Sequence, residues 1–215
     1  MNMKYTEIDL NTYKRKEHFE LFKSDGQCTF SMTAEIDITK LIHQTKSKDL
    51  KFYPVMIHTI SKVVNSVPEF KMSMKDGKLI VWDQINPSYT IFHKESETFS
   101  SLWSYYKPNL PDFIDVYTKD NNKYGKSPSY LAKGEFLENT FFVSAVPWVS
   151  FTSFDMNFSK IENFFAPLFT MGKYFTRNDK VFIPLSVQVH HAVCDGFHIG
   201  KVINQLQKLC SNIEL

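Results

Sequence analysis

The chain has 215 residues, of which 43% are hydrophobic and 22% are charged. This composition is that of a globular protein and excludes a disordered chain. Lys and Arg number 25 against 23 Asp and Glu, so the net charge of +2 offers no concentrated basic excess for nucleic-acid binding. The 20 Phe residues indicate a thick core, an aromatic-lined pocket, a large subunit interface, or all three.

The sequence lacks the motifs of several common kinds of site. Its 7 Gly form no glycine-rich phosphate loop, and the 3 cysteines form no C-x-x-C pair, which argues against a zinc site or a disulfide framework. The N-terminus has no apolar signal segment, and no apolar run approaches the roughly 18 residues of a membrane helix. We therefore expect a reduced, soluble, cytoplasmic protein that uses neither nucleic acid nor membrane.

The first half of the chain alternates between helix and strand patterns. Asp9 or Asn11 is placed to cap a helix to about Phe22, residues 28–36 read as a strand, and Asp37 is placed to cap a short helix. Pro54 suits a helix first turn, and apolar residues follow it at helical spacing: Ile57, Ile60, Val63, Val64 and Val67. Residues 70–75 and 78–83 flank Asp76-Gly77, which predicts a hairpin with a type I′ turn.

The second half is richer in strands. We predict strands at residues 88–94, 98–103, 140–146, 151–158, 166–174 and 180–191, a helix opened by Pro111, and a closing helix over 197–210. No linker or repeat interrupts the chain, so we expect residues 1–215 to form a single domain. The fold class is α/β, a two-layer sandwich in which helices cover a large mixed β-sheet.

Two adjacent histidines end the last predicted strand. Because strand side chains alternate between faces, His190 shares a face with Ser186 and Gln188, and His191 points the other way, which weakens a metal site built on both. A strand that turns sharply into a helix projects its last side chain into a cleft, where a neutral imidazole can serve as a base. Asp195 is placed to orient that histidine, to cap the final helix or to pair with a distant arginine.

Residues 190–196, His-His-Ala-Val-Cys-Asp-Gly, match H-H-x-x-x-D-G. This motif resembles that of the chloramphenicol acetyltransferases and related coenzyme A-dependent acyltransferases. Six further segments, residues 13–19, 51–54, 70–77, 97–103, 147–154 and 165–173, resemble the chloramphenicol acetyltransferases themselves, so the likeness runs nearly end to end. It implies a coenzyme A-dependent acyltransferase-like fold.

The resemblance implies an antibiotic-resistance activity, transfer of acetyl from acetyl-CoA to the 3-hydroxyl of chloramphenicol. Acetyl-CoA is then a co-substrate, with no permanently bound cofactor or metal. His191 is implied as the general base, Ser144 as the donor to the oxyanion of the tetrahedral intermediate, and Thr170 as the residue that positions a water beside it. Both substrates meet in one ternary complex without an acyl-enzyme.

The resemblance also implies supporting residues and a quaternary structure. Asp195 is implied to pair with Arg15 in a structural role. The family forms homotrimers with sites at subunit interfaces, so we expect His191 to face a drug pocket that the neighbouring subunit supplies, Phe22 and Phe30 included. The implied drug-binding residues are Phe22, Cys28, Phe30, Phe99, Ser101 and Met156, and the implied coenzyme A-binding residues are Trp148, Lys173 and Tyr174.

Two alternatives stay open. One is an acyl-CoA-dependent transferase with another hydroxyl or thiol acceptor. The other is a non-catalytic protein that binds hydrophobic drugs, or a metal through His190, His191 and His198. Cys28 and Cys194 lie near the pocket and the motif, where we expect neutral buried thiols rather than nucleophiles.

Overall fold

The computed structural model describes residues 4–24, 26–158 and 163–214. None of the helices within these ranges combines the length and apolar character needed to cross a bilayer. In chain order the elements are β1 (Tyr5–Glu7), α1 (Lys16–Lys23), β2 (Thr29–Asp37), α2 (Thr39–Ser47), α3 (Phe52–Ser66), the 3₁₀ helix η1 (Pro68–Lys71), β3 (Met72–Lys75), β4 (Lys78–Trp82), β5 (Asn86–His93), β6 (Thr98–Trp103), α4 (Leu110–Tyr124), β7 (Thr140–Val146), β8 (Leu168–Gly172), β9 (Phe175–Arg177), β10 (Lys180–His190) and α5 (Gly196–Asn212).

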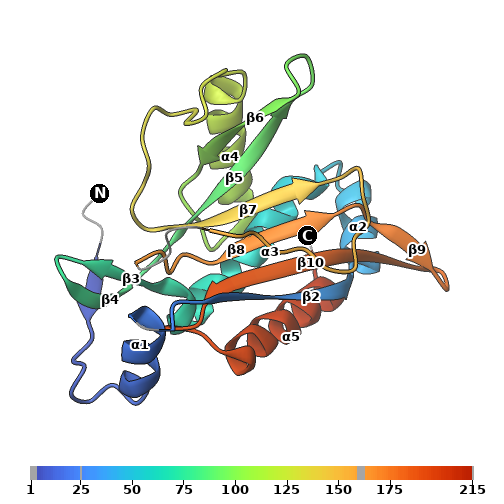
Figure 1. The fold of residues 1–215 in the computed structure, drawn as a ribbon. Coiled ribbons are helices and arrows are strands. Elements are labelled where there is room, and N and C mark those ends of the chain that lie inside the picture. Colours follow the sequence, from blue (N-terminus) through green and yellow to red (C-terminus); the bar gives the residue numbers. More distant parts are fainter. Residues whose placement is uncertain (1–3, 25, 159–162, 215) are drawn as a thin grey trace.

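A large mixed sheet forms the centre of the molecule (Figure 1). Its strands lie in the order β2-β10-β8-β7-β5-β6, and β9 pairs with the start of β10. β7 is parallel to both β5 and β8, whereas β10 is antiparallel to β2 and β8. A smaller sheet, β1-β4-β3, lies beside α1. The sheet and the helices on it confirm the predicted α/β fold.

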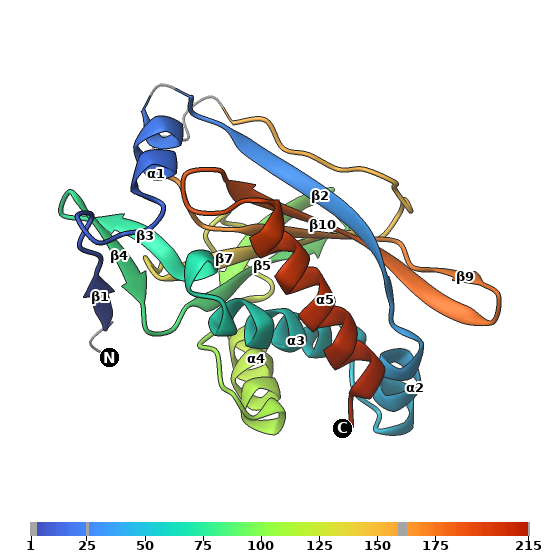
Figure 2. The same ribbon diagram turned by 90° about the horizontal axis from the view of Figure 1, so that it is seen from below.

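Helices α2, α3 and α5 cover one face of the large sheet (Figure 2). Val187 and Val189 of β10 belong to the same buried core as Val202 and Leu206 of α5, and the predicted apolar stripe of α3 is also buried there. Because β10 alternates, Ser186, Gln188 and His190 point to the opposite face of the sheet. The helix-free face is therefore the one that carries polar side chains.

Local sequence signals placed several elements correctly. The hairpin of β3 and β4 turns at Asp76 and Gly77, whose φ angles of 50° and 77° suit a type I′ turn. Helix α4 begins at Leu110, beside Pro111, and the Asn109 side chain accepts a hydrogen bond from the Asp112 N–H. The Asp37 carboxylate accepts from the Thr39 N–H at 3.0 Å and so satisfies the first N–H of α2, although Ile38 rather than the predicted Asp37 holds the N-cap position.

Two predictions about local structure are wrong, and two short strands, β1 and β9, were not predicted. Helix α1 begins at Lys16, because the Asp9 carboxylate accepts from the Asn11 N–H and forms a turn there instead. Residues 151–158 form no strand. They cross the polar face of the sheet as an extended strap, held by side chains: Ser186 Oγ donates to Phe154 O, and Gln188 bonds both the N–H and the C=O of Met156.

Candidate active site

The sharp turn after β10 places His191 at a corner of the chain. Pairing between β10 and β2 continues one step beyond His190, because the His191 N–H donates to Cys28 O at 3.0 Å. The N–H groups of Val193 and Cys194 then both donate to His190 O, which closes the turn. Asp195 starts α5 as its N-cap, and its carboxylate accepts from the Phe197 N–H at 3.0 Å.

The imidazole of His191 is held in one orientation. Its Nδ1 lies 3.0 Å from Cys194 O, and since a carbonyl only accepts hydrogen bonds, Nδ1 carries the hydrogen. In the neutral ring Nε2 is then the unprotonated nitrogen, which is the arrangement a general base requires. The ring of Phe22 stacks on the imidazole at 4.0 Å between centroids, and the ring of Phe30 lies 5.0 Å away.

These two contacts correct one expectation. Phe22 and Phe30 lie against His191 of their own chain, so they form the support of the histidine rather than a wall contributed by a neighbouring subunit. Phe22 comes from α1, and Phe30 lies on β2, whose pairing with β10 leads directly to the turn. Sequence spacing gave no sign of this packing, since α1 is remote from the motif in the sequence.

Arg15 and Asp195 form the predicted ion pair, and Asp195 also caps α5, so both structural roles expected for it are confirmed. Burial alone would raise the pKa of Asp195, but the electrostatic effects of His198 and of the Arg15 guanidinium, together with the Phe197 N–H, outweigh burial and lower it. His198 extends the cluster, since its Nδ1 lies 2.9 Å from the Asp195 carboxylate and its Nε2 lies 3.6 Å from the Glu69 carboxylate. Glu69 was missed because it is far from the motif in the sequence.

His190 has a different environment from His191. It is 1% exposed, and its Nδ1 accepts from the Ala192 N–H at 3.1 Å. Burial, together with the neighbouring His191, lowers the pKa of His190 to about 4, so the ring is neutral at pH 7. Within the described part of the chain, no three His, Cys, Asp or Glu side chains are grouped so that they could hold a metal ion.

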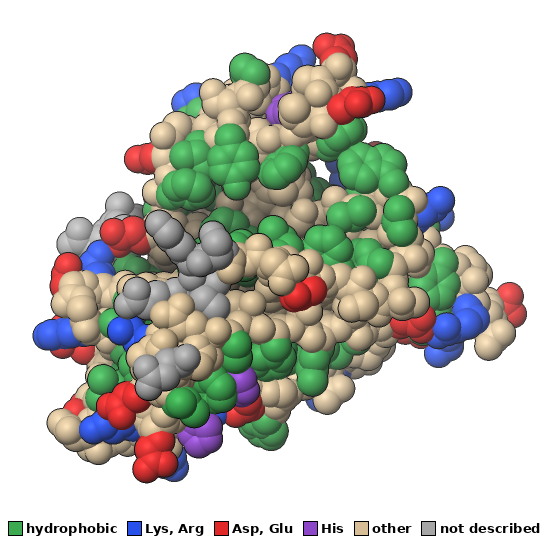
Figure 3. All heavy atoms as spheres, viewed as in Figure 1, with side chains coloured by type: hydrophobic (Ala, Val, Ile, Leu, Met, Phe, Trp, Pro, Cys, Tyr) green, Lys and Arg blue, Asp and Glu red, His purple; other side chains and the backbone are tan. Residues whose placement is uncertain are grey.

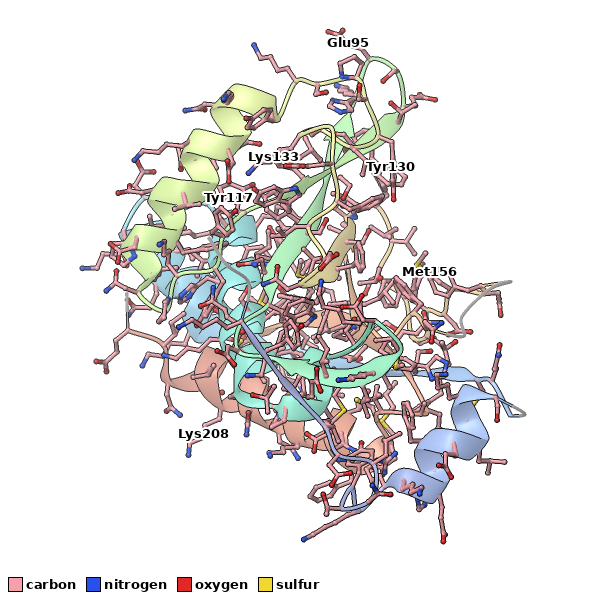
Figure 4. The ribbon with its side chains drawn as sticks, turned by 90° about the vertical axis from the view of Figure 1, so that its left-hand side faces the viewer. Glu95, Tyr117, Tyr130, Lys133, Met156 and Lys208 are labelled. Atoms are coloured by element: carbon pink, nitrogen blue, oxygen red, sulfur yellow. The ribbon has the colours of Figure 1, made fainter. Side chains whose placement is uncertain are left out.

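A cavity of about 570 Å³ opens on the polar face of the sheet. It gathers five of the predicted site residues, namely Phe99, Ser101, Ser144, Met156 and Thr170. Figure 3 shows hydrophobic side chains around a hollow on this side of the molecule, and Figure 4 shows Tyr130 and Met156, both of which line the cavity, on the same side. We refer to this space as the acceptor cavity.

The sheet supplies hydroxyl groups to the floor of the acceptor cavity. Ser144 on β7 is in register with Thr170 on β8, so the two side chains stand beside each other on one face. The register of β5 and β6 brings three more hydroxyl residues to that face, namely Ser88, Thr90 and Ser101. Ser88 and Thr90 were missed, because the facing of a strand residue depends on pairing with distant strands.

His191 and Ser144 of one chain do not meet. Ser144 pairs with Thr170, and Thr170 pairs with Ser186, four residues before His190 on β10. At about 3.3 Å per residue and about 4.8 Å between strands, the Cα of His190 lies roughly 13 Å along and roughly 10 Å across the sheet from that of Ser144. No serine and histidine side chains span such a distance to act on one reacting group.

A second groove gathers the three residues implied for coenzyme A. It has a volume of about 390 Å³, and Trp148, Lys173 and Tyr174 line it together with Phe52 and Phe92. The ring of Phe92 lies edge-on to Trp148 at 4.8 Å, and Phe52 contacts Tyr174 at 6.3 Å. Thr90 lines this groove and the acceptor cavity, so the two spaces adjoin at β5.

The thiols near the motif are protonated, as expected. Burial raises the pKa of Cys28, and burial with the nearby Glu69 carboxylate raises the pKa of Cys194. A further cavity of about 710 Å³, between α3, α4 and the end of α5, contains none of the predicted site residues. Its His58 is already bonded to the carbonyls of Lys107 and Pro108.

The fold and the turn after β10 define a class of protein. A solved chloramphenicol acetyltransferase superposes with a TM-score of 0.87 at 22% identity, covering 95% of this chain and 99% of that one. A probable dihydrolipoamide acetyltransferase from Listeria monocytogenes superposes with a TM-score of 0.68 at 15% identity, covering 97% and 95%. The chain thus has the fold of the coenzyme A-dependent acyltransferases.

Sequence comparison narrows the class to one family. The profile of the family described as "Chloramphenicol acetyltransferase" matches residues 3–207 of this chain. A protein from Proteus mirabilis named chloramphenicol acetyltransferase is 56% identical to this chain, and the match covers 94% of this chain and 93% of the relative. One of the same name from Escherichia coli is 53% identical, and the match covers 96% of this chain and 94% of the relative. One from Clostridium butyricum is 45% identical over 99% and 97%. The chain belongs to the chloramphenicol acetyltransferase family.

Proposed function

We propose that this protein is a chloramphenicol O-acetyltransferase that transfers the acetyl group of acetyl-CoA to the 3-hydroxyl of chloramphenicol. The observation that carries the proposal is the fixed tautomer of His191 within a chain of this family, because Nδ1 bonds Cys194 O and leaves Nε2 to accept a proton. Acetylation of the drug hydroxyl would make the protein a determinant of antibiotic resistance, acting in the cytoplasm as a single-domain subunit.

The role proposed for each group is the one that the family resemblance implies. His191 Nε2 takes the proton of the 3-hydroxyl as that oxygen attacks the thioester carbonyl. Negative charge then develops on the carbonyl oxygen, where the Ser144 hydroxyl donates a hydrogen bond and Thr170, in register beside it, holds a water. Collapse of the tetrahedral intermediate forms the ester and expels the thiolate of coenzyme A, which the protonated His191 neutralises.

Binding of the two substrates uses the two adjoining spaces. The aromatic walls of the acceptor cavity suit the aryl ring of chloramphenicol, with Phe99, Ser101 and Met156 in contact. The groove of Trp148, Lys173 and Tyr174 offers aromatic faces for an adenine ring and a cation for phosphate, which suits coenzyme A. The thioester then reaches the cavity where the groove adjoins it at Thr90.

We propose that the active unit is a homotrimer in which His191 of one subunit faces Ser144 of the next. The separation of these residues within one chain supports this, since catalysis needs both at one reacting carbonyl. Apolar side chains around the His191 corner are exposed, with Leu21 at 51%, Met32 at 41% and Phe197 at 76%. Such a patch is typical of a surface that a second subunit covers.

Purified protein tests the proposal when it is mixed with acetyl-CoA and chloramphenicol and the release of free coenzyme A thiol is followed with a thiol reagent. We expect drug-dependent thiol release and a 3-O-acetyl product. Turnover with other alcohols or thiols but not with chloramphenicol would favour the alternative acceptor. Drug binding without thiol release would favour a non-catalytic binding protein.

A further inference from the structure

The floor of the acceptor cavity carries a pair of hydroxyl groups that take no part in the proposed acetyl transfer. Ser88 on β5 and Ser101 on β6 are 4% and 9% exposed, and their Oγ atoms are 2.8 Å apart. We propose that this pair is a hydrogen-bonding site for the polar substituent at the far end of the acceptor, which in chloramphenicol is the aryl nitro group. This inference rests on the proposed function, and it names the part of the acceptor molecule that the cavity recognises.

The pair has one hydrogen to spare. Two hydroxyls carry two hydrogens, and the bond between Ser88 and Ser101 uses one of them. Among the residues that the structure describes, no other group bonds either oxygen, so the second hydrogen is free to turn toward the cavity that both side chains line. A buried donor without an acceptor is costly, and a ligand oxygen in the cavity removes that cost.

The distance from the reacting centre decides which substituent can reach the pair. Ser101 pairs with Thr90 on β5, and the strand beyond β5 is β7, which carries Ser144 at the same level. Ser101 therefore lies two strands, or about 10 Å, from Ser144. In chloramphenicol the dichloroacetamide is attached next to the carbon of the 3-hydroxyl, whereas the nitro group stands at the opposite end of the molecule.

Aromatic side chains flank the pair where the aryl ring would lie. Phe99 is two residues before Ser101 on β6, so it shares the cavity face, and its ring meets that of Tyr130 at 5.8 Å. Tyr130 is held against the pair, because the Ser101 N–H donates to Tyr130 O at 2.6 Å. The cavity thus combines an apolar slot for a ring with a hydroxyl donor at its end.

Serine-to-alanine variants test this proposal. In Ser88→Ala or Ser101→Ala the remaining hydroxyl keeps its hydrogen for the ligand, so KM for chloramphenicol should change less than about twofold. The double variant removes both donors, and its KM for chloramphenicol should rise about fivefold, the loss of one neutral hydrogen bond. KM for acetyl-CoA should stay unchanged. With an analogue in which hydrogen replaces the nitro group, the double variant and the wild type should have equal KM values.

The same hairpin offers a matched control. Ser96 and Thr98 also place their hydroxyl oxygens 2.8 Å apart, but they are exposed beyond the cavity, so Ser96→Ala/Thr98→Val should leave every KM unchanged. If the alanine pair does not fold, Ser88→Cys/Ser101→Cys gives the same comparison, because thiols are weak donors.

Three outcomes would overturn the proposal. An equal rise in KM for chloramphenicol and for the analogue without the nitro group would mean that the pair only shapes the cavity wall. An unchanged KM for chloramphenicol in the double variant would mean that the serine pair forms no hydrogen bond with the nitro group. A wild-type protein that fails to acetylate chloramphenicol would refute the proposed function itself, and this is measured before any variant is made.

Discussion

Arg15 immediately precedes α1 and Asp195 immediately precedes α5, and their side chains form an ion pair although 180 residues separate them in the sequence. Arg15 also donates to His191 O at 3.4 Å. Helix α1 carries Phe22, whose ring stacks on His191. The pair therefore holds the helix that supports the imidazole against the turn that carries it.

Replacing Asp195 by Asn should lower the free energy of unfolding by about 1–2 kcal/mol at pH 7, less than for a fully buried pair because the carboxylate is partly exposed. The pKa of Asp195 is lowered in the folded protein: burial opposes ionisation, and the electrostatic effects of His198 and of the Arg15 guanidinium outweigh it. The stability from this carboxylate is therefore present above its ordinary pKa of about 4 and is lost as the pH falls through the lower folded value.

Denaturant unfolding at several pH values measures this effect. The difference between wild type and Asp195→Asn should shrink below about pH 4. Asp179→Asn, in the exposed turn between β9 and β10, serves as the control and should show no such trend. A difference that is independent of pH would mean that the carboxylate acts without its charge.

His191→Ala should nearly abolish turnover, because it removes the Nε2 that accepts the hydroxyl proton, while chloramphenicol still binds. Steady-state kcat and equilibrium binding of the drug measure the two effects separately. His190→Ala is the comparison, and it should cost less in kcat because this imidazole points to the other face and bonds the Ala192 N–H. A His191→Ala variant within tenfold of the wild-type kcat would refute the assignment of the base.

Ser144→Ala should lower kcat about a hundredfold with little change in KM, since the hydroxyl meets charge that develops mainly in the transition state. Ser150→Ala, on the exposed segment after β7, should leave kcat unchanged. If Ser144→Ala changed KM alone, Ser144 would be a substrate-binding residue with no part in stabilising the oxyanion.

Mixed trimers test whether the site is shared between subunits. Subunits with His191→Ala and subunits with Ser144→Ala should be nearly inactive alone. After they are unfolded and refolded together, some interfaces combine an intact His191 with an intact Ser144, so activity should exceed the sum of the separate preparations. Mixed trimers without such a gain would mean that each chain builds its site alone.

Patterns within short stretches of sequence predicted much of the fold correctly. The hairpin at Asp76-Gly77 depends on the φ angles of two residues, and the stripe of α3 depends on a helical period, so both follow from neighbouring residues. The strand-turn-helix around His191 was likewise evident from the chain between Lys180 and Cys210. The Arg15–Asp195 pair was expected from family resemblance rather than from spacing.

Features that depend on contacts between residues far apart in the sequence could not be predicted from such local patterns. Residues 151–158 are rich in Phe, as many buried strands are, yet Ser186 and Gln188 of β10 bind their backbone and no ladder forms. The facing of Ser88 and the separation of His191 from Ser144 follow from the strand order β10-β8-β7-β5-β6. Strand order and register arise from burial of one face of the whole sheet against α2, α3 and α5, a free energy to which residues far apart in the chain contribute together.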